Sequence, residues 1–258
     1  MCDPRSILIT GASSGIGAAL ALEYSDPDRK LFLIGRDQCR LEAVADACRQ
    51  RGSKVRTELL DVTDKAGMES SIYQIDDEIP LDLVIANAGI SAGSDGLQGD
   101  ALGHLTRQLF DVNVHGLLNT VLPTLDRMRP RRSGQIALVS SMAGFRGFPG
   151  AEAYCATKAA VRVYGEGLRV SAAAEGISVS VICPGYVRSA MTSANDFPMP
   201  FLMNADRAAR IIRHGLAANR ARIAFPRRMA AIVWLMHSLH PRFVDSILSR
   251  LPRKPTTG

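Results

Sequence analysis

Short apolar runs alternate with longer segments of helical period, and this alternation limits the possible folds more than any other feature of the sequence. The runs are rich in Val, Ile and Leu and end at Gly, Asp or Pro, which is typical of parallel strands covered on both faces. Six strand–helix units without a long linker predict one doubly wound α/β domain, a parallel sheet flanked by helices. The predicted strands are residues 6–10, 30–35, 54–60, 81–87, 134–140 and 177–183. The predicted helices are residues 16–25, 37–51, 64–78, 101–129 and 152–175, then 205–219, 227–239 and 241–251 in the C-terminal part.

The first predicted strand runs directly into the glycine-rich segment "GASSGIG" at residues 11–17. Gly11 allows a tight turn after the strand, and Gly15 and Gly17 let the next helix begin close to both a phosphate group and the sheet. The unpaired N–H groups and the positive dipole end of that helix suit a pyrophosphate. The segment therefore predicts a dinucleotide site; a turn that needs glycine for packing alone is the alternative.

The glycine-rich segment is part of a longer motif, "TGASSGIG" at 10–17. Further motifs follow along the chain: "NAG" at 87–89, Asn113 in "FDVNVHG", "VSSMAG" at 139–144, "YCATK" at 154–158 and "CPGYVRS" at 183–189. In residues and in order, these motifs resemble those of the classical short-chain dehydrogenase/reductase family. The resemblance covers about residues 5–192 and implies a Rossmann-type oxidoreductase. Residues 1–190 would form the dinucleotide-binding and catalytic core, and residues 191–258 the substrate flap and C-terminal helices of the same domain.

Tyr154 and Lys158 are four residues apart in a predicted helix, so their side chains lie on one face, a turn apart. An ammonium nearby and the positive nicotinamide of an oxidised cofactor would lower the pKa of a phenol from about 10. The resemblance implies that Tyr154 is the general acid in reduction and the general base in oxidation. It also implies that Ser141 holds the substrate oxygen, Lys158 fixes the nicotinamide ribose, and Asn113 supports a water chain from the lysine to solvent. Ser140 is the alternative catalytic serine.

Arg36 follows the second predicted strand, in "LIGRD", where family members that use NAD usually carry an acidic residue. A guanidinium suits the 2′-phosphate of NADP through charge-assisted hydrogen bonds, so we expect NADP(H) to be preferred and keep NAD(H) as the alternative. Asp37 is an alternative partner for Arg36. The residues expected to bind the cofactor are Gly11, Ser13, Ser14, Gly15, Ile16, Gly17, Arg36, Asp61, Val62, Asn87, Ala88, Gly89, Tyr154, Lys158, Pro184, Gly185, Val187 and Ser189.

Residues 188–207 correspond to the family's mobile flap over the substrate, and this segment is rich in Met and Phe. Such a lining fits a small hydrophobic carbonyl or alcohol substrate; a flap that only packs on the core is the alternative. The residues expected to contact the substrate are Phe148, Tyr186, Met191, Phe197 and Phe201.

The positive charge is concentrated towards the C-terminus. Residues 206–258 carry 11 Lys and Arg against two Asp, whereas the preceding residues carry 20 basic against 23 acidic side chains. One hypothesis is that the last helices lie on a membrane surface with their arginines towards the headgroups. The preferred alternative is that they pack over the substrate pocket or a partner subunit. No nucleic-acid-binding module is recognisable, and the family resemblance implies a homodimer or homotetramer.

Five scattered cysteines without a CxxC pair indicate reduced thiols rather than a disulfide framework or a zinc site. No signal peptide fits the first residues, and the longest apolar run, "MAAIVWLM" at 229–236, is too short to span a bilayer. We therefore expect a cytoplasmic protein, or a peripheral membrane protein if the last helices bind lipid. His237 and His240 lack acidic companions, so no metal site is expected.

An enzyme is not the only function class to weigh. A binding protein that senses NAD(P) without catalysis is the alternative, although such proteins tend to lose the Tyr or the Lys, and both are present here. Epimerases and dehydratases of related fold are longer and have a different glycine spacing.

Overall fold

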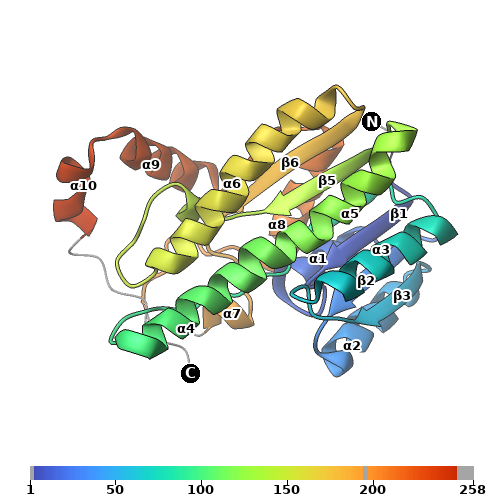
Figure 1. The fold of residues 1–258 in the computed structure, drawn as a ribbon, viewed down its shortest axis with the longest axis horizontal. Helices are drawn as coiled ribbons and strands as arrows, with labels where there is room; N and C mark the ends of the chain where they lie inside the picture. Colours follow the sequence, from blue (N-terminus) through green and yellow to red (C-terminus); the bar gives the residue numbers. More distant parts are fainter. Residues whose placement is uncertain (1–2, 194–196, 249–258) are drawn as a thin grey trace.

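Seven parallel strands form one sheet in the order β3-β2-β1-β4-β5-β6-β7 in the computed structural model, which describes residues 3–193 and 197–248 (Figure 1). The order reverses between β1 and β4, as in doubly wound folds. This arrangement confirms the predicted fold class. The strands are β1 (Ser6–Thr10), β2 (Lys30–Gly35), β3 (Lys54–Leu59), β4 (Leu83–Ala86), β5 (Gly134–Val139), β6 (Ile177–Pro184) and β7 (Arg222–Phe225).

Helices cover both faces of the sheet (Figure 1). Because successive side chains of a strand point to opposite faces, Ile7 and Ile9 of β1 pack in one apolar layer and Leu8 in the other. The first layer contains α1, α2 and α8, and the second contains α3, α5 and α6. The helices are α1 (Gly15–Glu23), α2 (Gln38–Arg49), α3 (Lys65–Glu78), α4 (Gly99–Phe110), α5 (Gly116–Arg131), α6 (Glu152–Ala173), α7 (Ala190–Ser193), α8 (Ala205–Ala217), α9 (Arg227–Ser238) and α10 (Pro241–Leu248).

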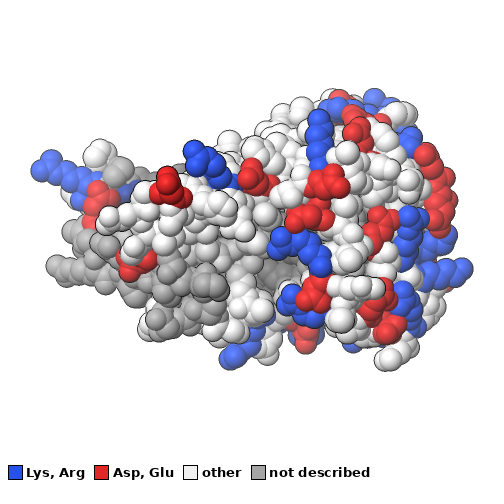
Figure 2. Space-filling model, turned by 60° about the horizontal axis from the view of Figure 1, so that its bottom comes forward, with Lys and Arg blue, Asp and Glu red and all other residues white. Residues whose placement is uncertain are grey.

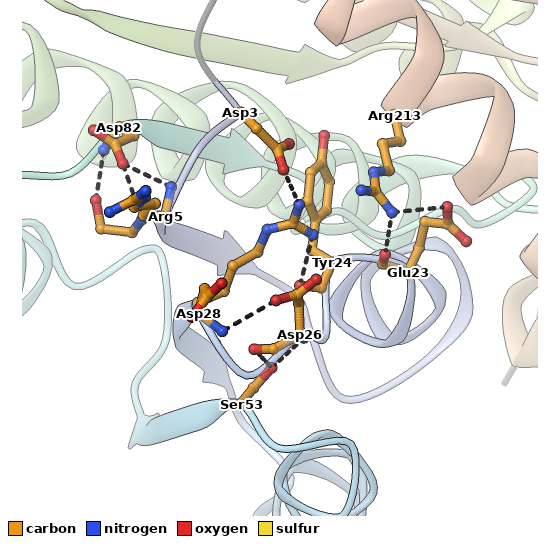
Figure 3. Close-up of polar contacts among 11 residues, drawn as sticks. Asp3, Arg5, Glu23, Tyr24, Asp26, Asp28, Ser53, Asp82 and Arg213 are labelled. Carbon is orange, nitrogen blue, oxygen red and sulfur yellow. Dashed lines mark hydrogen bonds and ion pairs between the residues drawn. The ribbon is translucent and has the colours of Figure 1, made fainter.

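A polar network joins residues near the amino ends of β1 and β2 (Figure 3). It lies at the end of the sheet opposite the carboxyl ends of the strands. The buried Arg29 pairs with Asp3 and donates a hydrogen bond to the carbonyl of Tyr24. Asp82 accepts hydrogen bonds from two backbone N–H groups at the start of β1. Arg213 of α8 donates to the carbonyl of Glu23, at the end of α1. These contacts lie at the amino ends of the strands, so the loops at the carboxyl ends remain available to form a site.

Two parts of the predicted element pattern are wrong. The four-residue strand β7 was not predicted, because an apolar run this short gives no clear period; it joins the sheet by pairing with residues 181–184 of β6. The helix predicted over 101–129 is three segments, α4, a π-helical turn at Asp111–His115, and α5. The last predicted helix, 241–251, corresponds to α10, and its final residues lie outside those that the structure describes.

The C-terminal helices α9 and α10 project from one end of the molecule (Figure 1). No helix among the described residues is both long and apolar enough to cross a membrane.

Candidate active site

A cavity of about 950 Å³ opens at the carboxyl ends of the strands. Parallel strands bring their loops together at this edge, and the reversal of strand order between β1 and β4 separates those loops into a crevice. Segments far apart in the sequence therefore meet there: the loops after β1, β2, β4, β5 and β6, the start of α6, and α9.

The glycine-rich loop after β1 forms one wall of the cavity. Gly11 and Gly15 have φ of 65° and 57°, which side chains rarely adopt. Gly17 does not line the cavity. A Cβ there would lie 2.2 Å from the carbonyl oxygen of Gly11, so Gly17 allows α1 to pack against the loop. Asn87, after β4, donates to the carbonyls of Thr10 and Gly11 at 2.9 and 3.2 Å and fixes the turn.

The start of α1 fits a phosphate group. Ser14 is the N-cap residue, and its side chain makes no capping hydrogen bond, so the N–H groups of the first turn face the cavity without a side-chain acceptor. Ser189 lies across the loop, with its Cβ 3.1 Å from the position of a Cβ on Gly15. A side chain at position 15 would therefore crowd Ser189.

Arg36 lies at the tip of β2, where its guanidinium is 3.1 Å from the Asp61 carboxylate. Both side chains line the cavity. Burial favours a higher pKa for Asp61, but hydrogen bonds from Thr63 and Arg36 outweigh it and lower the pKa of this carboxyl. Asp37, the alternative partner of Arg36, instead caps α2 and pairs with Arg40. The cation at the tip of β2 thus remains directed towards the cavity.

Ser141, Tyr154 and Lys158 meet at the centre of the cavity wall. The Lys158 ammonium lies 5.9 Å from the centre of the Tyr154 ring and donates to the carbonyl of Val139 at 3.1 Å. Burial lowers the pKa of Lys158 to about 8. Burial also raises the pKa of Tyr154, and hydrogen bonds with Ser141 and Ser91 oppose that rise. The predicted lowering of the phenol pKa is therefore not seen in the protein alone, because desolvation of the phenolate dominates.

Ser91 was missed by the sequence analysis, although it stands only two residues after the "NAG" motif. It lines the cavity and hydrogen bonds with Tyr154. The alternative serine, Ser140, is disfavoured, because its buried hydroxyl donates to the carbonyl of Lys158 at 2.6 Å.

Asn113 is buried behind the cavity wall rather than in it. Its side chain accepts from the N–H of Ile90 at 2.8 Å and donates to the carbonyl of Ile90 at 3.0 Å and to Thr157 at 3.1 Å. A Cβ on Gly89 would lie 3.0 Å from the Asn113 Oδ1 and 3.2 Å from the Lys158 Nζ. A side chain at position 89 would therefore crowd both Asn113 and Lys158, and glycine leaves the space beside them open.

The far end of the cavity is apolar. Its walls include the five residues predicted to contact a substrate, Phe148, Tyr186, Met191, Phe197 and Phe201. Four side chains of α9, not predicted individually, complete it: Met229, Ile232, Val233 and Met236. Their i, i+3, i+4, i+7 spacing was the available signal, since it places all four on one helix face. The preferred hypothesis of packing over the pocket agrees with this position of α9.

The cavity brings together every residue predicted to bind cofactor or substrate except Gly17. The cofactor set that lines it is Gly11, Ser13, Ser14, Gly15, Ile16, Arg36, Asp61, Val62, Asn87, Ala88, Gly89, Tyr154, Lys158, Pro184, Gly185, Val187 and Ser189. Within the described residues, no group of three or more His, Cys, Asp or Glu could hold a metal ion. His237, on α9, instead contacts the carbonyl of Phe145.

Comparison with known proteins agrees with this geometry. Residues 5–197 match the family model described as short chain dehydrogenase. The chain belongs to the short-chain dehydrogenase family. This short-chain dehydrogenase is 36% identical over 248 residues to an uncharacterized oxidoreductase of Myxococcus xanthus, covering 96% of this chain and 97% of the relative. It is 32% identical over 194 residues to a 3beta-hydroxysteroid dehydrogenase of Mediterraneibacter gnavus, covering 74% of this chain and 68% of that protein.

Among solved structures, a short-chain dehydrogenase from Sphingobium yanoikuyae in complex with NADPH superposes with a TM-score of 0.80 at 25% identity, covering 98% of both chains. A bulky-bulky ketone specific alcohol dehydrogenase from Comamonas testosteroni has a TM-score of 0.75 at 22% identity and covers 96% of this chain and 95% of its own, a likeness of fold. The protein is thus an oxidoreductase of a family that binds nicotinamide cofactors.

Proposed function

We propose that this short-chain dehydrogenase transfers hydride between NADP(H) and a hydrophobic carbonyl or secondary alcohol. The observation that carries the proposal is the single cavity that joins the glycine-rich loop and Arg36 at one end to an apolar pocket at the other, with Ser141, Tyr154 and Lys158 between them. A relative of known structure binds NADPH, and the proposal extends that preference to this chain.

The residues around the cavity suit a nicotinamide dinucleotide. The turn at Gly11 and the uncapped start of α1 would hold the pyrophosphate. Arg36 would bind the 2′-phosphate, for which the guanidinium retains donors beyond the one directed to Asp61. Lys158 is buried and donates one hydrogen bond to the carbonyl of Val139, so its ammonium has further N–H groups to offer the nicotinamide ribose. Bound NADPH would supply the hydride in reduction, and NADP⁺ would accept it in oxidation.

Side chains of the protein itself donate and accept the proton of the substrate hydroxyl. In reduction the Tyr154 hydroxyl donates its proton to the substrate oxygen while Ser141 donates a hydrogen bond to the same oxygen. In oxidation the Tyr154 phenolate takes the proton back. The Lys158 ammonium lies 5.9 Å from the centre of the phenol ring, and a positive charge there would favour the Tyr154 phenolate.

The apolar end of the cavity supports a bulky hydrophobic substrate. Aromatic, Met and Pro side chains surround it, and such walls stabilise ligands mainly by burying apolar surface. The similarity to a 3beta-hydroxysteroid dehydrogenase supports the same substrate class.

Cofactor titration tests the first half of the proposal. NADPH and NADH binding would be followed by fluorescence for the wild type, for Arg36→Asp, and for Arg49→Asp as a control outside the cavity. We expect the wild type to prefer NADPH, and Arg36→Asp to lose tenfold or more in NADPH affinity, since hydrogen bonds to charged groups contribute about 1.5–3 kcal/mol. Equal affinities for both cofactors, unchanged in Arg36→Asp, would refute the NADP preference.

An activity assay tests the second half of the proposal, the reaction with a hydrophobic carbonyl substrate. Oxidation of the preferred reduced cofactor would be measured with a panel of aryl and alicyclic ketones. Tyr154→Phe should lose at least about a hundredfold in kcat, the usual contribution of a positioned proton donor. Full activity in Tyr154→Phe would exclude the proposed proton transfer.

A further inference from the structure

We infer that the outer surface of α9 and α10 docks on an anionic lipid membrane. The starting observation is that α9 is apolar on two faces. Met229, Val233 and Met236 face the cavity, while Trp234 and Leu235 on the other side are 60% and 56% exposed. A helix that only covered a pocket would carry polar residues on its outer face.

Arginines lie on that same outer face. Arg227 and Arg228 precede Trp234 and Leu235 by seven residues, which is two helical turns, so each pair shares one side of α9. The outer face of α9 therefore runs from two exposed cations at its start to two large apolar side chains near its end.

The cations at the start of α9 belong to a wider basic groove. This groove has a volume of about 770 Å³ beside β7 and α8, and three further arginines line it: Arg207, Arg220 and Arg222. Arg222 pairs with Glu166, whereas no ion pair is found for the other four arginines within the described part of the chain. A groove with surplus cations attracts anions such as lipid phosphates.

Helix α10 continues the apolar surface. Leu239 precedes it and is exposed, and Phe243 within it is 70% exposed; Arg242 beside Phe243 is exposed as well. The only acidic residue between 207 and 248 is Asp245, which pairs with Arg146 at 3.3 Å. The outer surface of α9 and α10 thus combines large apolar side chains with arginines and lacks an unpaired carboxylate among the described residues.

Charge complementarity identifies the occupant of this surface. Residues 206–258 carry 11 basic against two acidic side chains, so a second copy placed on the same surface would bring like charges together. An anionic bilayer offers the opposite charge to the arginines and an apolar interior to Trp234, Leu235 and Phe243. In the view of Figure 2, acidic and basic side chains mix at the end of the molecule that carries β2 and β3, where the control positions of the experiment below lie.

Docking would also place the cavity beside the membrane. Ile232 lines the cavity and is 52% exposed, so the cavity opens next to the docking surface. That a lipophilic substrate enters from the bilayer rests on the proposed function; the binding itself does not, and it can be tested without cofactor or substrate.

Vesicle binding of the full chain tests the inference. Trp234 is the only tryptophan in the sequence, so its emission reports on this surface alone. We expect co-sedimentation with phosphatidylcholine vesicles that contain phosphatidylglycerol, a blue shift of the Trp234 emission, and quenching by brominated lipid. Binding should weaken as salt is raised and be at least tenfold weaker with phosphatidylcholine alone.

Paired variants separate the two components of the surface. Arg227→Gln/Arg228→Gln and Leu235→Ser/Phe243→Ser should each reduce the partition coefficient about tenfold or more. The controls are Lys54→Gln/Lys65→Gln for charge and Leu59→Ser for an exposed apolar side chain at the other end of the molecule; both should bind as the wild type does. Absence of vesicle binding, binding without a change in Trp234 emission, or an oligomer that Leu235→Ser/Phe243→Ser dissociates would each overturn the inference.

Discussion

At the scale of single residues, Lys158 stands out because it is a buried cation that forms no ion pair with a carboxylate among the described residues. Desolvation lowers its pKa from 10.5 to about 8, so its charged form destabilises the folded protein by an amount on the order of 3 kcal/mol. The same ammonium is the group proposed to hold the cofactor and support the Tyr154 phenolate. Stability is thus lost at the position where binding and proton transfer need a positive charge.

The stability of the cofactor-free protein should therefore depend on pH through Lys158. Below pH 8 both the folded and the unfolded chain carry the proton, and the destabilisation is complete; between pH 8 and 10.5 the unfolded chain binds more protons, so this group makes stability rise with pH. We expect Lys158→Met to be more stable than the wild type by about 2 kcal/mol at pH 7, after the loss of the hydrogen bond to Val139, and the difference to shrink above pH 8. Urea denaturation from pH 6 to 10 measures it, with the exposed Lys65→Met as a control that should show no such trend.

At the scale of elements, the π-helical turn at Asp111–His115 decides where Asn113 points. The N–H of Gly116 bonds to the carbonyl of Asp111, five residues back, and the extra residue interrupts the helix between α4 and α5. Asn113 is thereby buried against Ile90 and Thr157, and its three hydrogen bonds join the loop after β4 to α6. The loop that lines the cavity and the helix that carries Tyr154 are thus held together by one side chain.

Removing the Asn113 amide should be costly for the fold. Asn113→Ala would leave the half-buried N–H and carbonyl of Ile90 without their side-chain partner, and we expect a loss of about 2–4 kcal/mol in the free energy of unfolding. Asn119→Ala is the matched control, since it removes one hydrogen bond, to the carbonyl of Val62, and should cost about 1 kcal/mol. Chemical denaturation compares the two, and equal losses would show that Asn113 does not join the loop to α6.

At the scale of the whole molecule, large apolar side chains are exposed on the helical layer that contains α5 and α6. They are Leu122, Val163 and Val170. Val163 and Val170 are seven residues apart and share one side of α6. Exposed apolar side chains are typical of protein interfaces, and these three lie on the long helices through which the family resemblance implies a homodimer or homotetramer.

We expect the protein to be a homo-oligomer that depends on this surface. Val163→Glu/Val170→Glu would introduce charges into the interface and should reduce the mass measured by light scattering to that of one chain. Leu59→Glu, an exposed position on β3, should leave the mass unchanged. A wild-type monomer would contradict the expectation.

Much of the architecture follows from local features of the sequence. Strands buried on both faces must be apolar along their whole length, which is why "SILIT" and "KLFLIG" could be recognised without a structure. The turn at Gly11 needs positive φ, and the spacing of Tyr154 and Lys158 is a property of one helix. Motifs of this kind depend on few neighbours, so sequence alone predicted the doubly wound fold and the glycine-rich loop, and the family resemblance added most of the residues that meet in the cavity.

Other features depend on contacts between segments distant in the chain, and only the tertiary structure decided them. Strand β7 is too short to show a period and exists because β6 offers it an edge. The distinction between Gly15 in the cavity and Gly17 behind it depends on where the loop folds back on α1. The position of α9 over the cavity, with one apolar face inside and another outside, follows from packing against segments far away in sequence. Hydrophobic periodicity reports that a helix face is buried, but it carries no information on what buries it.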